Sequence, residues 1–159
     1  MPNASTSFFG WVAFLLQKYG MLFLRGTGMT LLIALTGTAL GFALGLLVAI
    51  IRTIALPEKK KAGSNAGVIV KRGLLRFVHM LMNVYIQVFR GTPMIVQAVV
   101  IYYGAQYAGV FMDTTFAAVF IISINTGAYM AEIIRGGIVS VDKGQFEAAH
   151  AIGMTHWQT

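Results

Sequence analysis

The stretch GTGMTLLIALTGTALGFALGLLVAII, residues 26–51, decides the fold because it runs for 26 residues without a charged side chain. A helix needs about 20 mostly apolar residues to cross the hydrocarbon core of a bilayer. Two more mostly apolar stretches lie at about 91–112, without a charged side chain, and 114–134, where Glu132 is the one charged side chain. Backbone polar groups in lipid must be hydrogen-bonded within the protein, so all three are expected to be helices. The sequence therefore predicts an all-α membrane protein with three transmembrane helices.

The composition agrees with a lipid environment. Apolar residues make up 57% of the chain and charged residues only 11%, against about 25% charged residues in soluble proteins. The net charge is +7, but eight of the twelve Lys and Arg residues lie between Arg52 and Arg90. A basic block beside an apolar span is typical of a cytoplasmic membrane face, so nucleic acid is not expected as a partner. The absence of cysteine excludes disulfides and thiolate metal sites.

The charge distribution also predicts the orientation. Only Lys18 and Arg25 precede the first span, and the turn between the second and third spans carries only Asp113. The basic segment 52–90 is therefore expected in the cytoplasm, with the N-terminus outside. This predicts a multi-pass protein of the cell membrane.

Two segments outside the spans are expected to be interfacial helices. The first lies within residues 1–25, on the extracytoplasmic side. The second lies within 52–90, after a basic loop, where one helix face carries Arg72, Arg76, His79, Asn83, Gln87 and Arg90. A basic amphipathic helix lies in the headgroup region of a membrane. A solvated helix face packed on protein is the alternative.

Three glycines in the first span favour close helix packing. Gly37, Gly41 and Gly45 recur at four-residue spacing, which lets another helix backbone approach closely. The pattern fits a tightly packed transporter core and equally any multi-pass bundle.

The start of the second span combines four informative residues, Arg90, Thr92, Pro93 and Gln97. Proline suits the first turn of a helix, and a threonine before it can cap that helix. A buried amide such as Gln97 must be paired. Gln97 is therefore expected either to line a polar path or to bond a neighbouring helix.

One face of the third span is polar. Asn125, Tyr129 and Glu132 fall at i, i+4 and i+7, hence on the same side of a helix. A carboxylate near hydrocarbon is expensive unless it is paired or hydrated. Glu132 is expected either to pair with Arg135 or to contact a substrate, and Asn125 sits deeper, as a better pathway candidate.

The segment 136–159 follows the third span on the expected cytoplasmic side. Its part KGQFEAAHAIG, residues 143–153, predicts a short helix that ends at Gly153. No metal-ligand spacing of histidines and no phosphate-binding glycine loop occurs in the sequence. Enzymatic activity and a cofactor are therefore not expected.

Three blocks together resemble the permease subunits of polar-amino-acid ATP-binding-cassette importers. They are VFRGTPMIVQ at 88–97 with YYG at 102–104, the run from Asn125 through YMAEIIRGGI at 129–138, and KGQFEAAHAIG at 143–153. The last block is similar to the EAA loop of that family.

The resemblance implies a five-helix core, of which this chain would supply the N-terminal three-fifths and end within the EAA loop. That loop would form a coupling helix that docks on a cytoplasmic ATPase, where ATP is hydrolysed. Glu147 would contact ATPase groups, Ala148 and Ala149 would keep the docking face small, and Gly153 would supply the turn. The other implied partners are an extracytoplasmic amino-acid-binding protein and a second permease, either a copy or a homologue.

A second hypothesis belongs to a different class. A chain with three spans and no pathway would be a small membrane scaffold or regulator, or a non-functional truncated permease. A membrane-bound enzyme ranks third because the sequence has no catalytic constellation.

Overall fold

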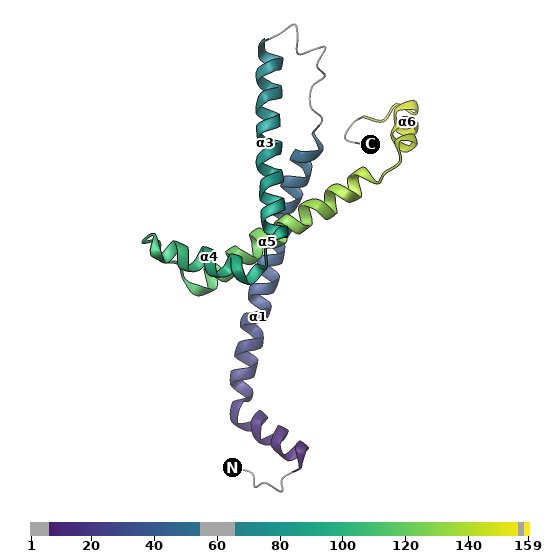
Figure 1. Cartoon of the computed structure of the whole chain (residues 1–159). Coiled ribbons are helices and arrows are strands. Elements are labelled where there is room, and N and C mark those ends of the chain that lie inside the picture. The colour runs from purple at the N-terminus through teal and green to yellow at the C-terminus, as the bar shows by residue number, and fades with distance from the viewer. Residues whose placement is uncertain (1–6, 55–65, 156–157) are drawn as a thin grey trace.

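The computed structural model describes residues 7–54, 66–155 and 158–159, and every regular element in these ranges is an α-helix (Figure 1). The basic run 59–61 lies outside the described residues. The helices are α1 (Phe8–Thr53), α3 (Ala66–Gly91), α4 (Met94–Tyr107), α5 (Thr114–Val139) and α6 (Lys143–Ala151). The predicted all-α fold is confirmed.

Helix α1 is one continuous element of 46 residues, so the predicted boundary between a helix in 1–25 and a span from residue 26 is not a break. Lys18 and Arg25 interrupt the apolar pattern, but both are good helix formers, and no proline lies between residues 8 and 53. At 1.5 Å per residue the helix is about 69 Å long. The interfacial location of its first part stays a prediction.

Helices α1 and α5 are each long and apolar enough to cross a membrane, and a third candidate span exists only if α3 and α4 are taken together. Within the second predicted span, 91–112, the structure places helix α4, Met94–Tyr107, and the span itself stays a prediction. Helix α4 has 14 residues, about 21 Å, which is shorter than a hydrocarbon core of about 30 Å. The chain bends by 111° between α3 and α4, where Pro93 supplies no backbone donor.

The centre of the fold is the crossing of α1 and α5. The three glycines Gly37, Gly41 and Gly45 are buried there. A Cβ atom at Gly41 would lie 2.9 Å from the Ser123 carbonyl oxygen, and one at Gly45 would lie 2.9 Å from that of Gly127. The predicted close approach of a second helix backbone is confirmed, and that helix is α5.

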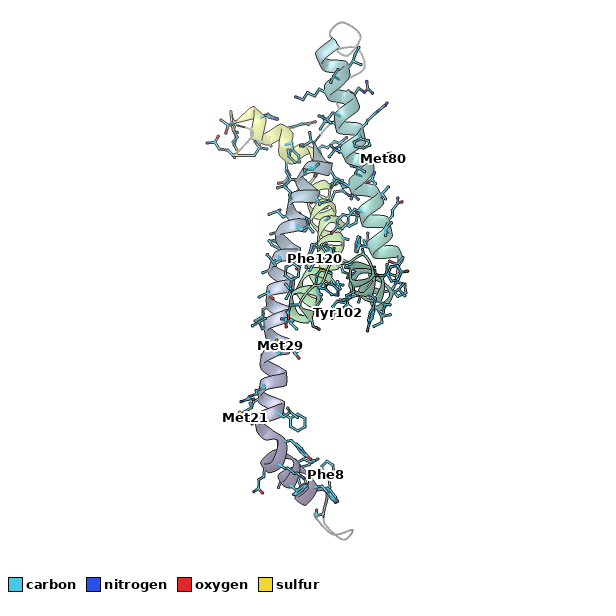
Figure 2. The ribbon with its side chains drawn as sticks, turned by 90° about the vertical axis from the view of Figure 1, so that its left-hand side faces the viewer. Phe8, Met21, Met29, Met80, Tyr102 and Phe120 are labelled. Atoms are coloured by element: carbon cyan, nitrogen blue, oxygen red, sulfur yellow. The ribbon has the colours of Figure 1, made fainter. Side chains whose placement is uncertain are left out.

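The first half of α1 makes no such contact. Figure 2 shows Phe8, Met21 and Met29 on a part of α1 that extends beyond the other helices. A Cβ added at Gly20, Gly26 or Gly28 would meet nothing within 4 Å.

Candidate functional site

The break between α3 and α4 is closed by side chains. A helix that stops leaves its last carbonyl groups without partners, which is costly away from water. Thr92 Oγ1 donates to the Val88 carbonyl at 2.7 Å, and Gln97 Nε2 donates to the carbonyls of Phe89 and Thr92, both at 2.9 Å. The predicted capping of α4 by Thr92 is wrong: the N-cap residue is Pro93, and Thr92 turns back to satisfy α3.

The same break is tied to α5. Gln97 is only 7% exposed, and its Oε1 accepts a hydrogen bond from Asn125 Nδ2 at 2.8 Å. The amide of Gln97 thus has partners at both ends. Of the two roles left open by the sequence, the structure shows the bond to a neighbouring helix.

Arg90 and Tyr129 link α3 to α5 one turn further on. The Arg90 guanidinium carbon lies 5.5 Å from the centre of the Tyr129 ring, a distance at which a cation and an aromatic face attract. Arg90 also stands in the last turn of α3, where a positive charge is favourable.

Glu132 binds two arginines. Its Oε1 accepts hydrogen bonds from Arg135 Nε at 3.1 Å and Nη2 at 2.6 Å, and its Oε2 accepts one from Arg52 Nη1 at 2.5 Å. The predicted Glu132–Arg135 pair is confirmed. The pairing with Arg52 was not predicted, because the two residues are 80 positions apart and no local spacing indicates it.

The polar face of α5 therefore serves as a seam that contacts three helices in turn. Asn125 bonds α4, Tyr129 contacts α3 and Glu132 pairs with α1. Tyr129 is the most open of the three, with 44% of its surface exposed. A role in a substrate pathway stays a prediction for all three and for Gln97.

The last described helix, α6, has a cap at each end. Asp142 accepts a hydrogen bond from the Gly144 N–H at 2.7 Å at its start. At its end Gly153 adopts φ +77°, and the N–H groups of Gly153 and Met154 bond the carbonyls of His150 and Ala149 at 3.0 Å. This is a Schellman motif, which requires a left-handed residue such as glycine. The predicted glycine stop is confirmed.

No residue of α6 is buried. Glu147 and Ala148 are exposed, and Ala149 is half-buried. An open groove lies along the helix, lined by Val141, Gln145, Phe146, Ala148, Ala149 and Ile152 together with Met154 and Thr159. Throughout the described ranges, no group of three His, Asp or Glu side chains is placed to hold a metal ion.

Residues 63–159 match the family model described as binding-protein-dependent transport system inner membrane component. The chain belongs to this family. The matched region contains the helix break, the α5 seam and α6.

The chain is 38% identical over 122 residues to the L-cystine transport system permease protein TcyB of Bacillus subtilis. That alignment covers 77% of this chain and 46% of TcyB. It is also 38% identical over 140 residues to the glutamine transport system permease protein GlnP of Escherichia coli, covering 87% of this chain and 55% of GlnP. The chain thus spans about half the length of these permeases.

A solved structure described as an amino acid ABC transporter with histidines has the same fold. Its TM-score is 0.72 at 34% identity, and the alignment covers 96% of this chain and 60% of that one. The resemblance to amino-acid permeases is confirmed, and the relatives are transport permeases, not enzymes. The scaffold hypothesis is not favoured.

Proposed function

We propose that this chain is the membrane-spanning subunit of an importer for polar amino acids and that a separate cytoplasmic ATPase drives it through α6. The substrate class follows the relatives, whose names specify L-cystine and glutamine. The observation that carries the proposal is α6 itself, a capped helix without a buried residue that follows a long apolar one.

Helix α6 is held by its caps and not by packing, which supports a docking role. An isolated helix of nine residues is marginal in water, and this one packs no buried side chain against the rest of the chain. Its two caps preserve its shape, and Figure 1 shows it standing apart from the crossing of α1 and α5. A helix with a fixed conformation that is not packed against the rest of its own chain can bind a partner surface.

The chemistry of the α6 surface fits the same role. Glu147 offers an exposed carboxylate to a cationic or hydrogen-bonding group of the ATPase. Ala148 beside it adds almost no bulk, so a second surface can approach the helix backbone closely. Gly153 fixes the direction in which the chain leaves the contact.

The rest of the proposal concerns the pathway and the other partners. An extracytoplasmic binding protein delivers the amino acid on the side of the N-terminus, and a second permease, a copy or a homologue, completes the path. Gln97, Asn125, Tyr129 and Glu132 are the pathway candidates. Tyr129 is the first choice for substrate contact, because it is the most exposed of the α5 seam.

The test uses the native transporter reconstituted in vesicles with its ATPase and binding protein. Glu147→Ala and Gly153→Val should each abolish uptake of radiolabelled glutamine, cystine or histidine while the permease still inserts. Gly153→Val is the stronger change, because valine resists a positive φ. The matched control is Lys143→Gln, a charge removal at the start of the same helix, which should leave uptake unchanged. Normal uptake by both test variants would overturn the proposal.

A further inference from the structure

The C-terminal end of α1 is fastened to two other helices at adjacent residues. Arg52, in the last turn of α1, donates to Glu132 of α5. The carbonyl oxygen of Ile51 accepts a hydrogen bond from His79 Nε2 of α3 at 3.0 Å. One turn of α1 is thus joined to α5 by an ion pair and to α3 by a hydrogen bond.

The ion pair is partly shielded from water. The side chains of Arg52, Glu132 and Arg135 are 18%, 26% and 34% exposed. Removing one partner from such a pair leaves an incompletely solvated charge without compensation, which is costly. Among the described residues, Arg52–Glu132 is the single salt bridge that joins two helices, since Glu132–Arg135 lies within α5.

Glu132 stands at the point where α5 leaves the helix crossing. Ala131 is fully buried, but a Cβ added at Gly136 or Gly137 would meet nothing within 4 Å, and residues 136–139 are exposed. The free end of α5 continues for seven residues beyond Glu132, about 10 Å of helix, and a short turn then leads to α6. Any displacement of α6 reaches the helix crossing through this end.

We propose that Glu132 is a positioning residue for coupling: through Arg52 it fixes the end of α1 to the part of α5 that carries α6. A force on α6 then moves α1 and α5 together. Without the pair, the free end of α5 swings and the force is lost before it reaches the rest of the permease. This inference rests on the proposed function and adds a role for Glu132 that differs from substrate contact.

Arg135 provides a matched control for the role of Arg52 in coupling. Arg135 binds the same carboxylate as Arg52, with two hydrogen bonds where Arg52 makes one. However, Arg135 lies on the same helix as Glu132 and cannot tie α5 to anything else. Loss of Arg135 removes a charge and two hydrogen bonds but leaves the link between the helices in place.

The experiment compares Arg52→Gln, Glu132→Gln and Arg135→Gln in the native transporter, reconstituted with its ATPase and binding protein. The quantity measured is ATP hydrolysed per molecule of glutamine, cystine or histidine imported. We expect Arg52→Gln and Glu132→Gln to raise this ratio by about fivefold or more, the lower end of typical coupling between sites. Arg135→Gln should leave it at the wild-type value. Co-purification of the ATPase should be normal in all three, because α6 is unchanged.

The charge exchange R52E/E132R separates coupling from stability. It restores an ion pair between α1 and α5 and keeps the net charge, so the ratio should return towards that of the wild type even if the single variants assemble poorly. An assembled exchange variant that stays uncoupled, or equal ratios for Arg52→Gln and Arg135→Gln, would overturn the inference. Failure of the wild-type chain itself to bind the ATPase and to transport would overturn the proposed function instead.

Discussion

The two halves of α1 have the same helical conformation, yet only the second packs against another helix, α5. Residues 8–36 include Gly20, Gly26 and Gly28, and residues 37–53 include the three glycines at 37, 41 and 45. All the buried residues of the helix belong to the second half: Gly37, Gly41, Gly45, Val48 and Ala49. Gly20, Gly26 and Gly28 of the first half face open space.

Spacing explains the difference. Residues four apart in an α-helix differ by about 40° in direction, so the second set forms one continuous groove. The glycines at 20, 26 and 28 are six and two positions apart and point to different sides. Helix association in lipid depends on close packing, because lipid tails are as apolar as the side chains. A groove serves that purpose, whereas scattered glycines do not.

The largest destabilisation is expected from Gly45→Leu, which fills the glycine groove of α1. Even a single Cβ at this position would lie 2.5 Å from Met130 Cβ and 2.9 Å from both the Ala131 nitrogen and the Gly127 oxygen. Two of these atoms are backbone and cannot move aside, so we expect a loss of about 3 kcal/mol or more in the free energy of unfolding. Titration of the purified permease with SDS in detergent micelles measures it. An unchanged midpoint would show that α1 and α5 do not pack as described.

A smaller effect is expected from Gly37→Ala. Its new Cβ would lie 2.6 Å from Ile122 Cγ2, and the nearest backbone atom, the Val119 oxygen, is 3.7 Å away. The isoleucine side chain can shift, and alanine gains up to about 1 kcal/mol in helix propensity over glycine. The net loss in the same titration should be about 1 kcal/mol. A loss as large as that of Gly45→Leu would mean that the groove is equally tight along its whole length.

The smallest effect should come from Gly28→Ala in the free half. No atom lies within 4 Å of the new Cβ, so only the helix propensity changes. The free energy of unfolding should stay within about 0.5 kcal/mol of the wild type or rise slightly. A clear destabilisation would reveal that a partner, such as a second permease, covers this half in the purified protein.

The parts of the fold that were predicted correctly depend on patterns local to one helix. The glycine groove and the Glu132–Arg135 pair follow from spacings of three or four residues, which a helix turns into neighbours. The glycine stop of α6 follows from a glycine placed directly after a short helical run. The apolar length of 26–51 and 114–134 is also a property of single segments. These features need no knowledge of the tertiary arrangement.

The parts that were missed depend on contacts between distant segments. The pairs Arg52–Glu132 and Asn125–Gln97 join residues 80 and 28 positions apart. Thr92 is of a residue type that often caps a helix N-terminus. In the structure its hydroxyl instead donates to the Val88 carbonyl, one of the last carbonyls of α3. The bend of 111° between α3 and α4 was missed for the same reason, since an apolar run of 22 residues does not reveal where a helix breaks.

The distance along the sequence between the glycine groove and α5 also determines how long α1 exists before α5 is synthesised. Chains grow at about 5–20 residues per second, and Glu132 is made 80 positions after Arg52, so α5 emerges roughly 4–16 s after the groove is complete. During that interval α1 must persist with its groove covered only by lipid or by another protein. The backbone hydrogen bonds of α1 are satisfied within the helix itself, so α1 can remain stable in the membrane until α5 is inserted.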